Sequence, residues 1–94
     1  MSLEAQYQTA LELTREMLAA AKSLDWNVLA RIENERATLV KNAATYRGTL
    51  SSQETERVAA LIAEIARESA EIIERAECWQ EHAKILLRIN KPTS

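Results

Sequence analysis

Between Gly48 and Pro92 the sequence contains neither glycine nor proline. These two residue types are the strongest breakers of regular secondary structure, and the chain has one of each. Alanine, leucine, glutamate, arginine and lysine, which favour helix, fill most of the other positions. The sequence therefore predicts an all-α fold in which one helix runs over residues 52–90. A helix of about 38 residues is about 57 Å long.

Two shorter amphipathic helices are expected before Gly48. In residues 3–22, apolar residues recur at helical spacing and charged residues fall opposite them. A second apolar stripe begins at Trp26, so Asp25 is the expected N-cap of a helix over residues 25–46. Each of these two helices reaches only about 30 Å.

The turn before the third helix has its own sequence signals. We expect Gly48 to adopt the left-handed conformation that closes a helix, and Ser51 with Glu54 to form a capping box that opens the next one. With 94 residues, the chain is expected to form one domain, an antiparallel three-helix bundle with a long third helix. About half of that helix would project, unless it bends back or another molecule covers it.

The end of the third helix is apolar on nearly all sides. Leu86 flanks the main apolar stripe, whereas Ile85 and Ile89 lie on the far side, near the line of Cys78 and His82. One explanation is that aliphatic residues sit singly on the surface, or that the last turn folds back. The other is a segment wrapped by a second copy of the chain or by a partner's helix. Under this second interpretation the contact residues are Ile72, Ile73, Trp79, Ile85, Leu86 and Ile89.

Charge and composition exclude several classes of function. The net charge of −2 lacks the basic excess of a nucleic-acid binder, so we expect no DNA or RNA partner. A single cysteine cannot form an internal disulfide. No apolar run approaches the length of a membrane span or follows a basic start like that of a signal peptide. A cytoplasmic protein without a membrane span is therefore expected.

The sequence gives little support for catalysis or metal binding. Glutamates recur along the polar face of the third helix, but without the Glu-x-x-His spacing that diiron bundles use. Cys78 and His82 have the spacing of two zinc ligands on one helical face, yet two ligands do not make a site. His82 also lacks the close-packing glycine of a phosphotransfer helix, and no nucleophile, base and oxyanion-donor set is present. We expect no enzyme, no cofactor and no metal site.

Three parts of the sequence resemble a known family. They are the run from Tyr7 through Met17-Leu18-Ala19-Ala20-Ala21 to Asp25-Trp26, the pattern W-x-x-L-x-x-I-E-x-x-R-x-x-L over residues 26–39, and the spacing of Leu61-Ile62, Ile65, Ile72 and Trp79. Together they cover about residues 5–88. These features resemble the flagellar protein FliT, a type III export chaperone.

The resemblance implies a small helical bundle without catalysis. Such a protein binds the C-terminal region of the filament-cap protein in the cytoplasm and prevents its premature assembly. The resemblance also implies the flagellar export ATPase apparatus and, in some bacteria, the master flagellar regulator as partners. Some family members carry a further C-terminal helix that covers the binding surface. No such helix follows Pro92, either because this branch lacks it or because the sequence is shortened.

One residue of the matching pattern joins the predicted contact surface. Trp26, Leu29 and Leu39 are expected in the bundle core, whereas Glu33 and Arg36 either pair with each other or contact a partner. We favour Arg36 touching a partner or capping a carboxylate on the third helix. An amphipathic helix docks in an apolar groove through anchors at i, i+3, i+4 and i+7. Arg36 and the six apolar residues named above are the predicted partner-binding residues.

Two other functions use the same surface. In a structural homodimer or coiled-coil adaptor, the projecting helices pair with each other and no client exists. An antagonist of a flagellar transcription regulator would bind that regulator through protein contacts. A homodimer is also an expected state of the chaperone itself.

Overall fold

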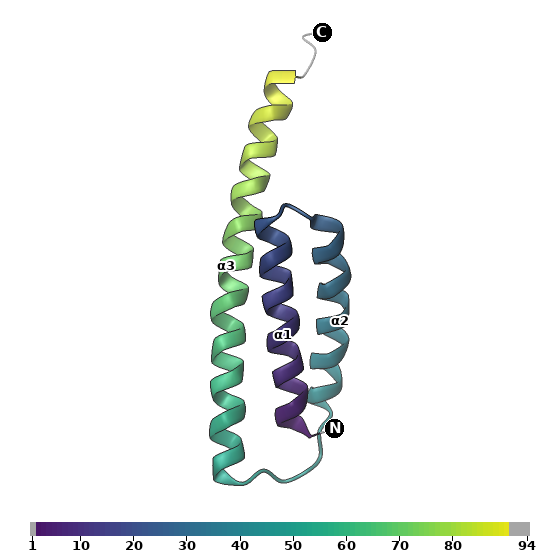
Figure 1. Cartoon of the computed structure of the whole chain (residues 1–94), viewed down its shortest axis with the longest axis vertical. Helices are drawn as coiled ribbons and strands as arrows, with labels where there is room; N and C mark the ends of the chain where they lie inside the picture. The colour runs from purple at the N-terminus through teal and green to yellow at the C-terminus, as the bar shows by residue number, and fades with distance from the viewer. Residues whose placement is uncertain (1, 91–94) are drawn as a thin grey trace.

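Three helices make up the chain. The computed structural model describes residues 2–90, and the side chains of residues 2–78. Helix α1 spans Leu3–Lys22, α2 spans Trp26–Ala44 and α3 spans Ser52–Asn90. The predicted all-α fold is confirmed. The main difference in helix bounds is the end of α2, which stops at Ala44, whereas the expected helix continued to about residue 46. Figure 1 shows α1 between the two other helices, with α2 running opposite to α1 and α3.

The helix starts follow the capping residues of the sequence. The side chain of Asp25 accepts a hydrogen bond from the backbone N–H of Val28 at 3.3 Å, as an N-cap does. At the start of α3, the Glu54 N–H donates to the Ser51 hydroxyl at 3.1 Å, and the Ser51 N–H donates to the Glu54 carboxylate at 3.3 Å. The predicted N-cap and capping box are therefore both present.

The left-handed residue lies in a different connection from the one expected. Leu24, between α1 and α2, has a φ of 59°, whereas Gly48 does not have a positive φ. The N–H groups of Leu24 and Asp25 donate to the carbonyls of Ala21 and Ala20, the two bonds of a Schellman motif. A Cβ atom at Gly48 would meet the end of the Tyr46 side chain, which is exposed.

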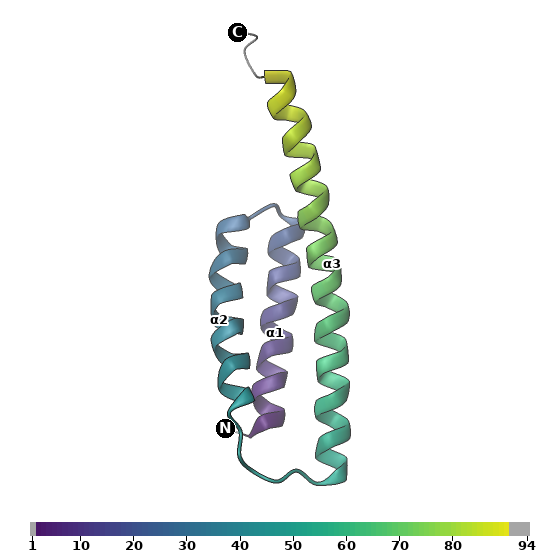
Figure 2. The ribbon, with the colours of Figure 1, turned by 180° about the vertical axis from the view of Figure 1, so that it is seen from behind.

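The core is centred on α1. Its buried apolar cluster consists of Met17, Leu18, Ile32 and Ile72, with Leu13, Val28 and Leu29 packed against it. Helix α1 packs against both α2 and α3, but within the described residues the backbones of α2 and α3 do not pack on each other. Figure 2 shows the same order from behind, with α1 again in the middle. One side of the bundle is therefore left open between the outer helices.

Helix α3 is much longer than its neighbours. It has 39 residues, against 20 in α1 and 19 in α2. It continues unbroken to Asn90 and extends past the ends of the other two helices (Figure 1). The molecule is consequently a rod of 64 × 19 × 19 Å. The alternative in which the end of this helix folds back onto the bundle is wrong.

Candidate functional site

A groove separates the two outer helices, and α1 forms its floor. We call it the α2–α3 groove; its volume is about 240 Å³. Its lining residues are Met17, Leu29, Glu33, Arg36, Ser69, Ile72, Ile73 and Ala76. Small-molecule pockets usually measure about 300–1,000 Å³ and a water takes up about 30 Å³. A hollow of this size suits a few side chains of a partner better than a cofactor.

Arg36 closes one end of the α2–α3 groove. Its Nη1 donates to the Ser69 hydroxyl on α3 at 2.8 Å and to the Thr14 hydroxyl on α1 at 3.2 Å. Thr14 is fully buried, and its own hydroxyl donates to the carbonyl of Ala10 at 2.8 Å. Arg36, Thr14 and Ser69 thus form a polar clasp that ties all three helices together.

The guanidinium of Arg36 keeps unused hydrogen-bond donors. A guanidinium has five N–H groups, and within the described residues Arg36 donates only through Nη1, to two neutral hydroxyls. The anticipated ion pair between Glu33 and Arg36 does not form, although both side chains line the groove. Among the described residues, Arg36 does not cap a carboxylate on α3, because its acceptor there is the hydroxyl of Ser69; its contact with a partner stays a prediction. A half-buried cation is thus left without an anionic partner in the described part of the chain.

The two isoleucines of the predicted contact surface have different surroundings. Ile72 is 6% exposed and belongs to the core cluster around Met17. Ile73 is 58% exposed, the largest exposure among the exposed large apolar residues of the described chain. Both line the α2–α3 groove, Ile72 from inside the bundle and Ile73 at the rim. Of the two, only Ile73 offers a partner a substantial apolar surface.

The other predicted contact residues lie on the extension of α3. Trp79, Ile85, Leu86 and Ile89 are all within the helix Ser52–Asn90. Their side chains fall outside the described residues, as does the side chain of His82. The structure therefore places these residues on α3 and leaves their contacts as predictions.

Several groove residues were not predicted from the sequence as parts of a site. Leu29 was expected in the bundle core, and Met17 and Ser69 were not among the predicted contact residues. The available signal was the pair of hydroxyl residues, Thr14 and Ser69, on faces that otherwise pack against apolar neighbours. Buried hydroxyls need hydrogen-bond partners, and the half-buried Arg36 supplies one to each.

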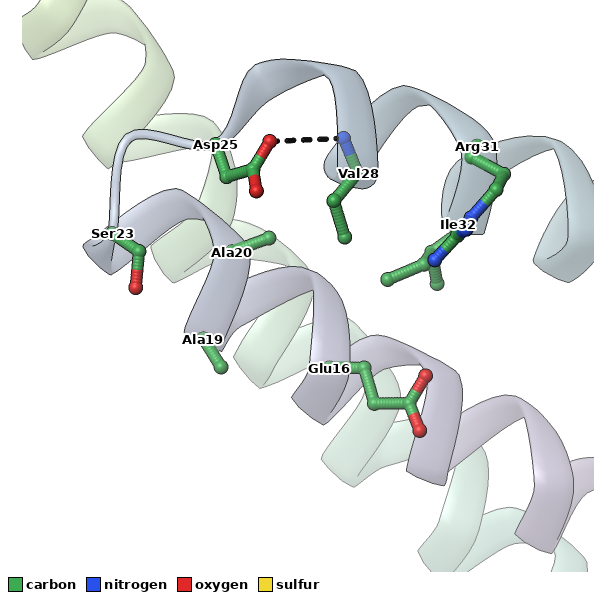
Figure 3. Close-up of a pocket in the computed structure, with 8 residues that line it drawn as sticks. All are labelled: Glu16, Ala19, Ala20, Ser23, Asp25, Val28, Arg31 and Ile32. Atoms are coloured by element: carbon green, nitrogen blue, oxygen red, sulfur yellow. Dashed lines mark hydrogen bonds between the residues drawn. The ribbon is translucent and has the colours of Figure 1, made fainter.

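A second hollow, of about 340 Å³, lies between α1 and α2 on another face of the bundle. Figure 3 shows Glu16 and Arg31 extending from its two helices and the hydrogen bond from Val28 to Asp25 beside the connecting loop. The small side chains of Ala19 and Ala20 leave this space between the helices. Of the predicted contact residues whose side chains the structure describes, Arg36, Ile72 and Ile73, none lines it.

A third hollow, of about 350 Å³, lies between α1 and α3. Arg57 on α3 and Glu4 on α1 both line it and form an ion pair at 2.6 Å. At its other end, a hydrogen bond from Arg67 lowers the pKa of the Glu64 carboxyl. The charged groups here are already partnered, in contrast to Arg36 in the α2–α3 groove.

The described part of the chain contains no metal-binding cluster and no membrane-spanning helix. Within it, no group of three or more histidine, cysteine, aspartate or glutamate side chains is placed to hold an ion. Cys78 is exposed on α3. None of the described helices has the length and apolar character needed to cross a membrane.

Comparison with known proteins identifies the family. The family model described as flagellar protein FliT matches residues 4–93, nearly the whole chain. The chain belongs to the flagellar protein FliT family. FliT is known as an export chaperone family of the flagellum and is not an enzyme family. No curated protein and no solved structure shows significant similarity to this FliT-family chain.

Proposed function

We propose that this chain is a flagellar type III export chaperone that binds the C-terminal region of the filament-cap protein. Binding in the cytoplasm keeps that subunit from assembling before export. Membership of the FliT family and the shape of the bundle support this function. The same reasoning from the family extends to contacts with the export ATPase apparatus and the master flagellar regulator.

The observation that carries the proposal is the open side of the bundle. Helices α2 and α3 both pack on α1 and leave the α2–α3 groove between them. An amphipathic helix binds such a groove by burying its apolar face against the walls. A client helix would take the place of a fourth helix and cover the exposed Ile73.

The extension of α3 adds the second half of the proposed surface. It continues the wall that α3 contributes to the groove, and its sequence contains Trp79, Ile85, Leu86 and Ile89. A client that lies in the groove and continues along this extension buries a longer apolar stripe than the groove alone provides. Arg36, Ile72 and Ile73 contact the client in the groove, and the four residues of the extension contact it beyond the bundle.

Co-expression with the C-terminal segment of the filament-cap protein tests this function. Ile73→Asp and Ile85→Asp each place a charge on the proposed surface and are expected to weaken binding by about tenfold or more. The control is Leu24→Asp, because Leu24 is 54% exposed and is not among the residues that line the groove. Circular dichroism confirms that each variant is folded. Normal binding by both folded isoleucine variants would contradict the proposed surface.

A homodimer through the same surface is the competing state. In this homodimer, the apolar residues on the extension of α3 in one copy pack against those of the second copy when no client is bound. Sedimentation of the native chain with and without the cap-protein segment separates the two. If the chain self-associates and the segment fails to displace the second copy, the groove serves a structural dimer rather than a client.

A further inference from the structure

The apolar faces that form the α2–α3 groove continue past the clasp of Arg36, Thr14 and Ser69. Val40 lies one turn beyond Arg36 on the same face of α2, and Ile62 lies two turns before Ser69 on the same face of α3. Val40 is 38% exposed and Ile62 is 44% exposed. The clasp therefore sits between two apolar sections, one beside Ile73 and one beside Ile62.

The charge at the centre of this surface lacks a counterpart. Arg36 is half-buried and donates to two neutral hydroxyls, and its remaining N–H groups have no acceptor in the described part of the molecule. Hydrogen bonds between a guanidinium and a carboxylate are about twice as strong as neutral ones, and a carboxylate can accept two in parallel. A bound segment that covers the groove would also exclude water, which strengthens such a pair.

Glu33 does not make the groove equally suited to a basic partner. It lines the groove but is exposed to solvent, whereas Arg36 is half-buried. A pair between exposed charges contributes little to binding, because water and salt screen it. The pairing of Arg36 is the larger effect, so the groove favours an acidic group at the level of the clasp.

We propose that the helix bound in the α2–α3 groove carries a carboxylate that pairs with Arg36, with apolar residues on both sides of it. This inference rests on the proposed function and names the chemistry of the client. One apolar section of the client contacts Leu29 and Ile73, and the other contacts Val40 and Ile62. The carboxylate lies between them, at the level of Ser69.

The geometry of α3 sets the spacing on the client. Ile62 and Ile73 are eleven positions apart in the sequence, which is about 16 Å along a helix. Ser69 lies four positions before Ile73 and seven after Ile62. A helical client that matches this surface therefore has two apolar residues about three turns apart. Its acidic residue falls about one turn from one of them and two turns from the other.

A double-mutant experiment tests the pairing. The probe is a labelled peptide from the C-terminal region of the filament-cap protein, in which each aspartate and glutamate is replaced in turn by asparagine or glutamine. The peptides are titrated against the native chain, Arg36→Gln and Arg31→Gln. One replacement is expected to weaken binding to the native chain about tenfold and to have no effect on binding to Arg36→Gln. Arg31→Gln removes the same charge from an exposed residue of α2 that lines the α1–α2 hollow instead of the groove. As the matched control, it is expected to behave like the native chain.

Arg36→Gln loses the clasp, so its folding is checked by circular dichroism. If it does not fold, Arg36→Lys replaces it; this variant keeps the charge but not the planar fork, and it is expected to retain part of the discrimination. The pairing is contradicted if the peptide binds but no acidic residue matters, or if the same residue matters equally in the Arg36 variants. In that case the proposed function stands. If no peptide binds the native chain, the proposed function fails together with the pairing.

Discussion

Ile72 and Ile73 are adjacent in the sequence, but replacing them with a charged residue is expected to affect the stability of the fold very differently. Ile72 packs in the core, whereas Ile73 is mostly exposed at the rim of the α2–α3 groove. A charge buried without a partner is strongly destabilising, on the order of several kcal/mol. We predict that Ile72→Asp unfolds the chain or nearly does so, and that Ile73→Asp changes the free energy of unfolding by only about 0.5 kcal/mol.

Urea unfolding followed by circular dichroism measures both variants. Equal destabilisation by the two substitutions would mean that Ile73 is also part of the core. The comparison matters for the binding tests, because a loss of binding by Ile72→Asp reports on folding and not on the surface. Ile73→Asp is the informative variant.

Thr14 tests whether the clasp contributes to stability. Its buried hydroxyl accepts from Arg36 and donates to the carbonyl of Ala10. Thr14→Val keeps the shape and removes the hydroxyl, so we predict a loss of about 1 kcal/mol in the free energy of unfolding. Thr14→Ser keeps the hydroxyl and is the control for hydrogen bonding. A valine variant at least as stable as the native chain would show that the clasp does not stabilise the bundle.

The connection between α1 and α2 contains a strained residue. Leu24 takes the left-handed position of a Schellman motif, which glycine usually occupies. A non-glycine residue there costs roughly 1 kcal/mol in backbone strain. We therefore predict that Leu24→Gly raises the free energy of unfolding by about 0.5–1 kcal/mol. Leu24→Ala removes most of the same side chain but keeps Cβ, and it should give no such gain when the two are compared by thermal unfolding.

The helices themselves could be predicted because their signals are local. The spacing of apolar residues, the cap at Asp25 and the capping box of Ser51 with Glu54 each act within one or two turns of chain. The left-handed residue was misplaced because the rule that glycine closes helices is a statistical preference. The tight closure of α1 imposed that conformation on Leu24 instead.

The groove could not be predicted from periodicity. An apolar stripe indicates which face of a helix is covered, but not how closely two stripes approach each other across a third helix. The stripes of α2 and α3 both meet α1 and remain apart, so Met17 and Leu29 line a groove as well as contributing to the core. Across this gap, Arg36 donates a hydrogen bond to Ser69 and does not pair with Glu33.

At the scale of the whole molecule, the proposed function depends on one continuous surface. It runs from the α2–α3 groove along the extension of α3, past the ends of the two shorter helices (Figure 1). The buried apolar cluster of the described residues involves none beyond Ile72. We propose that the extension serves a client or a second copy.

Amide hydrogen exchange with and without the C-terminal segment of the filament-cap protein tests this surface most directly. Backbone amides exchange more slowly where a partner covers and stabilises a helix. We predict slower exchange in α3 from about Ile62 to Asn90 and in the part of α2 that lines the groove, with no change around the α1–α2 hollow of Figure 3. Binding that leaves exchange in α3 unchanged, or protects only the α1–α2 hollow, would contradict the proposed client surface.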